Sequence, residues 1–417
     1  MGTKTEVLEV QNVTCERLAE GVALNGILQC QSSELDGVQL WFRYPLEVDQ
    51  YLSESAHPWI AALLMPAMRL GRSLRINLPV SSQFYRNMQR FMEIVHVWWP
   101  EYRPVAIETG EIADTAGNGT AVGCFFSGGV DSFYTVLKNA EREASSNSII
   151  SHLLFIHGFD IGLQANRIYR LAYDNISSAA ARFGINLLQC TTNIREVLCE
   201  EYASWPYCHG LLMASTALGI EKFWRQVYIP SSHKYSDLFP WGSHPLTDPL
   251  ISTDAVPFIH DGCEASRTNK VLWQVAKSDI ALDYLRVCWR NRFGKYNCGE
   301  CEKCIRTMIN LEVAGVLSKC KTFDRQLLHS DVANIPVRDQ NEWSFMIENL
   351  NAAVDKRCNP RLIKAIRKSL RPWAPLRPKR LARSIFRRLL RSVDAVLLKG
   401  HMRRAYGRYK NPEKRSL

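Results

Sequence analysis

Residues 124–132 read Cys124-Phe125-Phe126-Ser127-Gly128-Gly129-Val130-Asp131-Ser132, at the end of an apolar run that begins at Ala121. Two adjacent glycines let the backbone turn tightly and approach a ligand closely. A helix is expected from this turn to about Arg142, with its free N–H groups and its positive dipole end facing the ligand. A strand, a glycine turn and a helix in this order predict a binding loop for phosphate or pyrophosphate.

The polar residues of this loop predict its chemistry. The Ser127 and Ser132 hydroxyls could bond phosphate oxygens, and Asp131 could hold Mg²⁺. The loop is not a Walker A motif, because no Lys follows the glycines. The alternative is a tight strand-to-helix turn that binds nothing. The full string favours a ligand-binding loop made of Ser127, Gly128, Gly129, Val130, Asp131 and Ser132.

On the C-terminal side of the loop, apolar strands alternate with amphipathic helices. We expect strands at 152–157, 185–191 and 226–231, and helices at 166–183, 207–223, 269–286 and 305–317. Such alternation predicts an α/β fold, a doubly wound parallel sheet with helices on both faces.

Residues 1–115 predict a small α+β domain of unknown role, and 114–120 a polar linker. Strands are expected at 38–44 and 73–78, and helices at 57–68 and 87–99. We assign the binding loop and the cysteine motif to a second domain, residues 121–330. A basic helical tail then spans 331–417.

Four of the 13 cysteines are crowded: Cys288 precedes the motif formed by Cys298, Cys301 and Cys304. Four thiolates suit tetrahedral Zn²⁺, two-residue spacers let neighbouring thiolates converge on one ion, and Gly299 permits the knuckle turn. An iron–sulfur cluster is the alternative. The other cysteines are dispersed, and no secretory signal is evident, which favours a reducing cytoplasm.

The string SGGVDS after an apolar strand resembles the signature of PP-loop (N-type) ATP pyrophosphatases. The cysteine spacing resembles 7-cyano-7-deazaguanine synthase, over roughly residues 121–320. The resemblance implies an adenine nucleotide alpha hydrolase-like, Rossmann-like fold, which binds ATP and Mg²⁺ and carries a structural zinc. It also implies that Lys270 reaches the phosphates and that Asp160 contacts the adenosine. The alternatives are a solvated helix start for Lys270 and a loop cap for Asp160.

The expected function is that of an AMP-forming ligase. A substrate carboxylate or amide oxygen attacks the α-phosphate of ATP, and ammonia or an amine then displaces AMP. The predicted catalytic residues are Asp131, Ser127 and Lys270. The first alternative is sulfur insertion, with a sulfur-donating partner or with carriers among Cys190, Cys199, Cys208 and Cys263. The second is a nucleotide-binding regulator without turnover. The substrate stays open.

Residues 231–261 are long, aromatic and rich in His and Asp, so we expect a substrate-facing loop. The pocket candidates, with loop capping or a core histidine as the alternative, are His209, His233, His244, Asp248 and Asp254. Trp205-Pro206 is expected to cover the nucleotide.

The net charge of +11 is unevenly distributed. Residues 360–417 hold 19 Lys or Arg against two acidic residues, which leaves 33 basic and 39 acidic residues in the body. Residues 379–398 predict an amphipathic helix with a cationic face. An anionic membrane surface, the acidic body and nucleic acid remain open as its partner. No apolar run is long enough to span a membrane, so we expect a cytoplasmic or peripheral protein, and a homodimer is open.

Overall fold

The computed structural model describes residues 6–114, 117–143, 146–199 and 201–371. Its strands are β1 (Val7–Leu18), β2 (Gly21–Gln29), β3 (Gln39–Tyr44), β4 (Ser73–Ile76), β5 (Ile107–Thr109), β6 (Ala121–Phe125), β7 (His152–His157), β8 (Asn186–Thr192), β9 (Trp224–Pro230) and β10 (Phe258–Asp261). All ten form one sheet in the order β10-β9-β6-β7-β8-β3-β2-β1-β4-β5. The α/β class predicted from the sequence is confirmed.

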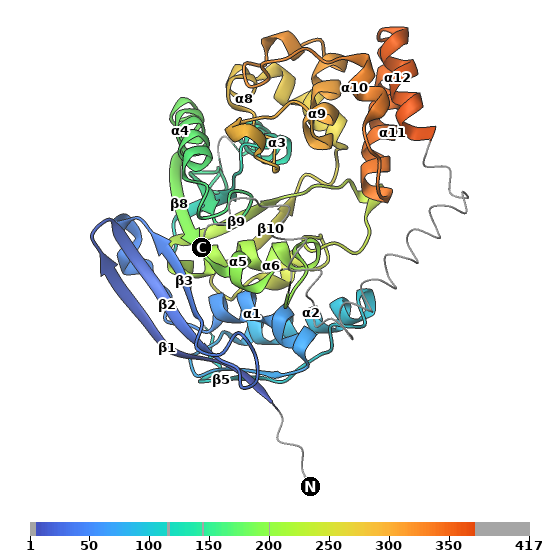
Figure 1. Cartoon of the computed structure of the whole chain (residues 1–417). Helices are drawn as coiled ribbons and strands as arrows, with labels where there is room; N and C mark the ends of the chain where they lie inside the picture. Colours follow the sequence, from blue (N-terminus) through green and yellow to red (C-terminus); the bar gives the residue numbers. More distant parts are fainter. Residues whose placement is uncertain (1–5, 115–116, 144–145, 200, 372–417) are drawn as a thin grey trace.

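Twelve α-helices accompany the sheet in the described part of the chain (Figure 1). They are α1 (His57–Leu70), α2 (Ser82–Trp98), α3 (Val130–Arg142), α4 (Asn166–Phe183), α5 (Ile194–Leu198), α6 (Trp205–Leu218), α7 (Arg267–Trp273), α8 (Asp279–Tyr284), α9 (Glu302–Val313), α10 (His329–Asn334), α11 (Gln340–Asp355) and α12 (Pro360–Leu370).

The five strands from β6 to β10 are parallel, and the central strand β6 is buried on both faces. Strand β6 is central: the chain adds β7 and β8 on one side and then β9 and β10 on the other. Alternate residues face different cores, since Leu153 and Phe155 pack with α3 and α4, whereas Leu154 packs toward α6. This order creates a switch point between β6 and β9, where open α/β sheets bind their ligands.

The N-terminal residues, expected to form a domain of their own, continue the same sheet. Strand β3 pairs antiparallel with β8, with Phe42 opposite Thr192. The Asn193 side chain accepts a hydrogen bond from Trp41 N at 3.0 Å, which extends this junction. One apolar core runs from Leu8 to Phe258, and α1 packs on α6. The linker near residue 115 therefore does not separate two sheets.

Most predicted elements are present, but strands β5 and β10 and the short helix α5 were not predicted. Strands β1 and β2 were not predicted, and β1 hides its alternation because its register shifts between Gln11 and Thr14. The single helix expected over 269–286 is wrong. Ser266 caps α7, and Ser278 caps α8 separately, because each side chain accepts a hydrogen bond from a backbone N–H in the first turn of its helix.

Helices α10, α11 and α12 pack on α9 around a third apolar cluster. This agrees with helical structure in the first part of the expected tail, and these helices lie together at one end of the molecule (Figure 1). The helix predicted over 379–398 lies outside the described residues. Among the helices that the structure describes, none is long and apolar enough to cross a membrane.

Candidate nucleotide site and cysteine centre

The glycine turn between β6 and α3 has the geometry of an anion-binding loop. Gly128 has a φ of +75°, which glycine adopts readily and other residues rarely do. Its carbonyl oxygen accepts a hydrogen bond from Arg286 N at 2.7 Å. Gly129 is the N-cap of α3 and offers no side chain to the helix, so the first N–H groups of α3 are left for a ligand.

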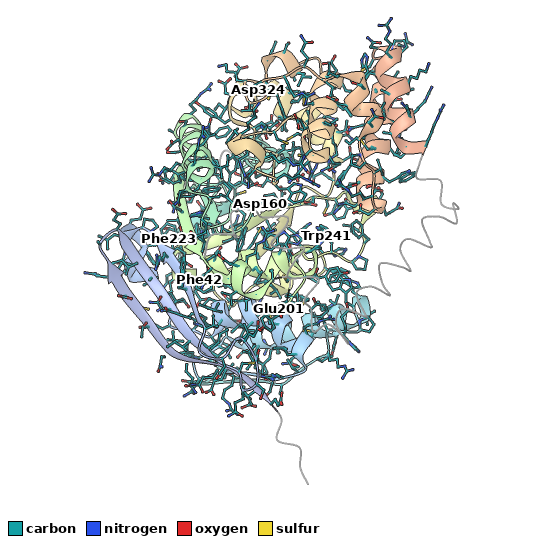
Figure 2. The ribbon with its side chains drawn as sticks, viewed as in Figure 1. Phe42, Asp160, Glu201, Phe223, Trp241 and Asp324 are labelled. Carbon is teal, nitrogen blue, oxygen red and sulfur yellow. The ribbon has the colours of Figure 1, made fainter. Side chains whose placement is uncertain are left out.

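A cavity of about 280 Å³ lies beside this loop, at the carboxyl ends of β6, β7 and β9. It therefore occupies the switch point of the parallel strands. The polar lining includes Ser127, Asp131, Ser132, Asp160, His209, Ser243, Arg267, Arg286 and Lys303, and the aromatic lining includes Phe159, Trp205 and Trp241. Asp160 and Trp241, both labelled in Figure 2, mark its position in the molecule.

Asp131 is an ionised carboxylate held by two cations. The Arg267 guanidinium contacts one carboxylate oxygen, and Lys270 Nζ lies 3.1 Å from the other. Burial raises the pKa of Asp131, but Arg267 and Lys270 outweigh it and bring the pKa down to about 2. The structure thus brings together the loop acid and the predicted lysine, although Arg267, and not Lys270, lines the cavity.

Lys270 is fully buried beneath Asp131. Its Nζ lies 2.5 Å from the carbonyl oxygen of Ser231, in the loop after β9. Lys270 therefore holds the Asp131 carboxylate in place without itself lining the cavity. Arg267 begins the same helix, α7, and a basic residue three positions before Lys270 was the available signal for it.

Asp160 lies on the cavity wall, after β7. Its Oδ1 lies 3.5 Å from Arg195, and its backbone oxygen accepts a hydrogen bond from Asn291 Nδ2 at 2.8 Å. Burial raises the pKa of Asp160, but Lys303 and then Arg195 outweigh burial, so the pKa is lowered and the carboxylate is charged. Of these two cations, Arg195 is the one in direct contact with the carboxylate.

The two loop serines differ in their freedom to bind a ligand. The Ser132 hydroxyl already donates to the Gly129 carbonyl oxygen at 3.1 Å, within its own turn. Ser127 is exposed at the cavity. We therefore regard Ser127 as the hydroxyl that is available to a phosphate.

The aromatic end of the cavity comes from α6 and the loop after β9. Arg195 lies over the Trp205 ring, 3.8 Å from its centroid. His209 Nδ1 lies 3.2 Å from the Trp205 carbonyl oxygen, and burial lowers the pKa of His209, so its imidazole is neutral at pH 7. Trp205 and His209, both predicted near the pocket, do line it.

The other four candidates of the 231–261 loop do not line this cavity. His233 is buried and stacks on Phe345, and Asp248 is fully buried between Ser243 and His260. Asp254 accepts from Gln83 N at the start of α2, which is the loop-capping role. Ser243, which does line the cavity, was not predicted.

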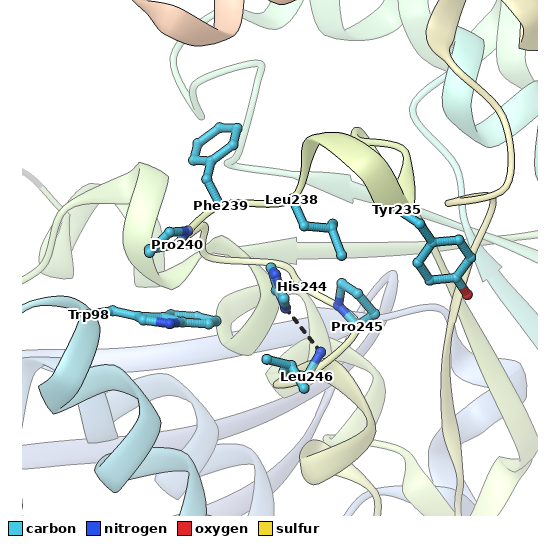
Figure 3. A pocket seen from close by; sticks show the side chains of 8 residues that line it. All are labelled: Trp98, Tyr235, Leu238, Phe239, Pro240, His244, Pro245 and Leu246. Atoms are coloured by element: carbon cyan, nitrogen blue, oxygen red, sulfur yellow. Dashed lines mark hydrogen bonds between the residues drawn. The ribbon is translucent and has the colours of Figure 1, made fainter.

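His244 lies instead in a separate, mostly apolar pocket formed by Trp98 and residues of this loop (Figure 3). Its Nδ1 accepts a hydrogen bond from Leu246 N at 3.0 Å, drawn as a dashed line. Its ring meets Trp98 edge to face, with 5.0 Å between the centroids. The ring therefore shapes the loop and does not face the cavity.

The four cysteines of the motif converge as their spacing predicts. Their sulfur atoms all lie within 4.8 Å of one another, and all four residues are buried. Cys298 Sγ and Cys304 Sγ are 3.8 Å apart. Tetrahedral thiolates on one Zn²⁺ stand roughly 3.8 Å apart, given Zn–S bonds of about 2.3 Å. The group could therefore hold a metal such as zinc.

The backbone of this centre is arranged as in a metal knuckle. Cys298 Sγ accepts from Cys301 N at 3.3 Å, and Cys301 Sγ accepts from Cys304 N at 3.4 Å. Gly299 has a φ of +70°, as the predicted turn requires. These N–H groups stabilise thiolate charge, which supports a metal-binding role.

In comparisons with known proteins, no family model, no curated protein and no solved structure matches the chain.

Proposed function

We propose that the protein is an ATP pyrophosphatase-type ligase of the PP-loop class. It would adenylate a carboxylate or amide oxygen of its substrate, release pyrophosphate, and pass the adenylate to ammonia or an amine. One observation carries this proposal: an uncapped helix N-terminus and the ionised Asp131 lie together at the switch point of a parallel sheet.

The loop supplies binding and charge neutralisation. The N–H groups at the start of α3, the Ser127 hydroxyl and the Arg267 guanidinium would hold the β- and γ-phosphates. The substrate oxygen attacks the α-phosphorus, the bond from the α-phosphorus to the bridging oxygen breaks, and pyrophosphate leaves with that electron pair. Positioning and electrostatics account for the rate, because no covalent step on the protein is needed.

Asp131 is also the residue that would hold Mg²⁺. Its carboxylate oxygens are the donors that this ion prefers, and its lowered pKa keeps them ionised at any physiological pH. Arg267 and Lys270 now engage both oxygens, so part of that pairing would be exchanged when the ion binds with ATP. When bound, Mg²⁺ supplies neutralisation of charge on the leaving pyrophosphate.

The aromatic end fits a planar group. Trp205, Trp241 and Phe159 offer ring faces and edges, while Asp160 offers a charged acceptor for ribose hydroxyls or a base amine. The purine of ATP or a planar substrate matches this lining. We therefore place the adenosine toward Asp160 and the triphosphate toward Ser127.

For the cysteine centre we propose zinc. In a four-iron cluster each thiolate binds a different iron, so the sulfurs would stand farther apart than around a single ion. The observed spacing supports one tetrahedral ion. Its role is structural, because all four ligands come from the protein and no coordination position is left for a substrate.

Sulfur insertion is the second candidate, and one observation weighs against it. Among the described residues that line the cavity there is no cysteine, and the four carriers considered, Cys190, Cys199, Cys208 and Cys263, are all buried elsewhere. Cys199 and Cys208 lie 3.8 Å apart, sulfur to sulfur, and contact each other. A thiol nucleophile would have to come from a partner.

A substrate-dependent ATP–pyrophosphate exchange screen tests the proposal. Carboxylates and nucleobases are added singly with ATP, Mg²⁺ and labelled pyrophosphate, and label in ATP reports reversible adenylation. Asp131→Asn should abolish the exchange, and Asp324→Asn, at an exposed ion pair with Lys295, is the matched control. ATP binding without exchange or turnover, with every substrate, would favour the regulator.

A further inference from the structure

Lys303 belongs to both of the sites described above. It lies between Cys301 and Cys304, and its side chain lines the cavity together with Ser127, Asp131 and Asp160. Lys303 itself is not among the possible metal ligands, which are the four cysteines. Through Lys303, the cysteine centre can therefore place a positive charge in the cavity.

The cysteine centre contacts the cavity by two further routes. Arg286, two residues before Cys288, donates its backbone N–H to the Gly128 carbonyl oxygen at 2.7 Å. Asn291, three residues after Cys288, donates its side-chain N–H to the Asp160 carbonyl oxygen at 2.8 Å. The segments on both sides of Cys288 thus contact the glycine turn and the opposite cavity wall.

The same segments are tied together beneath the cysteines. Asn297 accepts hydrogen bonds from Val287 N and Cys288 N, at 2.9 and 3.1 Å. Its own side-chain amide donates to the Leu285 carbonyl oxygen at 2.8 Å. Closing the cysteine centre therefore fixes residues 285–288, which contact the loop, and residues 301–304, which carry Lys303.

Charge around Lys303 favours an anionic ligand. Within the described ranges, no hydrogen bond or ion pair joins its ammonium to another side chain. Asp160 and Asp131 attract it, but each of these carboxylates also has a cation in direct contact, Arg195 and Arg267 respectively. Arg267 and Arg306 lie close enough to repel it. A bound anion would relieve this excess of positive charge.

We infer that Lys303 is an anion-binding residue of the cavity, one that contacts the phosphates of the nucleotide, and that the cysteine centre positions it. The inference rests on the proposed function for the identity of the anion. Metal binding and nucleotide binding are then coupled through the first turn of α9. A charge-assisted hydrogen bond to phosphate is among the stronger polar contacts, so its loss is measurable.

The test compares Lys303→Met with Lys295→Met by titration calorimetry against ATP, AMP and adenosine. Lys295 lies in the same cysteine segment but pairs with Asp324 and does not line the cavity. Metal content and the melting temperature are measured on each variant. We expect Lys303→Met to keep its metal and melting temperature, to weaken ATP about tenfold or more, and to leave adenosine unchanged. Lys303→Arg should restore most of the ATP affinity.

Three outcomes would contradict the inference. They are ATP affinity within twofold of wild type for Lys303→Met, equal losses for ATP and adenosine, and equal effects of the Lys295 and Lys303 variants. If the wild-type protein binds neither ATP nor AMP, the proposed function is wrong, and the anion that Lys303 binds is then not this nucleotide. Each of the three outcomes above contradicts the inference itself when the wild-type protein binds ATP normally.

Discussion

The cysteine centre and the nucleotide cavity are neighbours that were assembled in opposite ways. The four cysteines lie between residues 288 and 304, and their spacing alone brings the sulfurs together. The cavity instead draws its charged residues from the starts of α3, α7 and α9 and from the segments that follow β7 and α8. A local site can be predicted from spacing, whereas a distributed site depends on the strand order of the sheet.

The largest effect on turnover is expected at Asp131. Asp131→Asn keeps the shape of the side chain but removes the carboxylate that faces Arg267 and Lys270. We expect turnover to fall by about 10²–10³-fold or more, because preorganised charge at a transferring phosphate typically contributes this much. Steady-state kinetics measure it, with circular dichroism to verify folding. Near-normal turnover in a folded variant would remove Asp131 from the site.

Removing a ligand of the cysteine centre should mainly lower the stability of the protein. Cys301→Ser removes one of four ligands, and we expect loss of about one metal ion per chain and of several kcal/mol of unfolding free energy. Cys15→Ser, at an exposed cysteine, is the control. Metal analysis and thermal unfolding after anaerobic purification measure both. Iron with labile sulfide in the wild-type protein would contradict zinc and favour the sulfur alternative.

His260, in strand β10, predicts how the stability of the protein depends on pH. Burial lowers the pKa of His260, but the hydrogen bond and charge of Asp248 outweigh it and raise the pKa to about 9. Because the folded pKa lies above the unfolded one, this stabilisation is complete below about pH 6.5 and is lost as the pH rises through about 9.

The expected loss is on the order of 3 kcal/mol of unfolding free energy over that range. Denaturant unfolding between pH 6 and 10 measures it, and His260→Gln should flatten the slope. His96→Gln, at a half-buried histidine bonded to a backbone oxygen, is the control that should keep it. An unchanged slope in His260→Gln would assign the pH dependence to another group.

The smallest effect on turnover is expected from the basic tail. All residues of the cavity and the cysteine centre lie between 125 and 304, so deleting residues 375–417 should change ATP turnover by less than about twofold. The same deletion should reduce co-sedimentation with anionic vesicles at low salt, if the excess of basic residues binds lipid. A full-length protein that ignores such vesicles would exclude the membrane alternative.

Sequence reasoning found the residues whose role is set locally. The loop from Ser127 to Ser132 and the four cysteines were predicted, because turns and spacers act over a few residues. Lys270 was expected from the resemblance to reach the phosphates; it contacts Asp131 but does not line the cavity. Arg286 and Lys303 were missed as cavity residues, since only the packing of α9 and the cysteine segment against the sheet brings them to Asp131. The continuity of β3 with β8 was missed for the same reason, because strand pairing across 150 residues leaves no local signal.

The central claim is that the cavity supports cleavage between the α- and β-phosphates of ATP. Phosphorus NMR of the complete reaction, with the substrate found by exchange, tests it most directly. The account predicts AMP and pyrophosphate in equal amounts, no ADP, and no products with Asp131→Asn. ADP and orthophosphate as the products would contradict it.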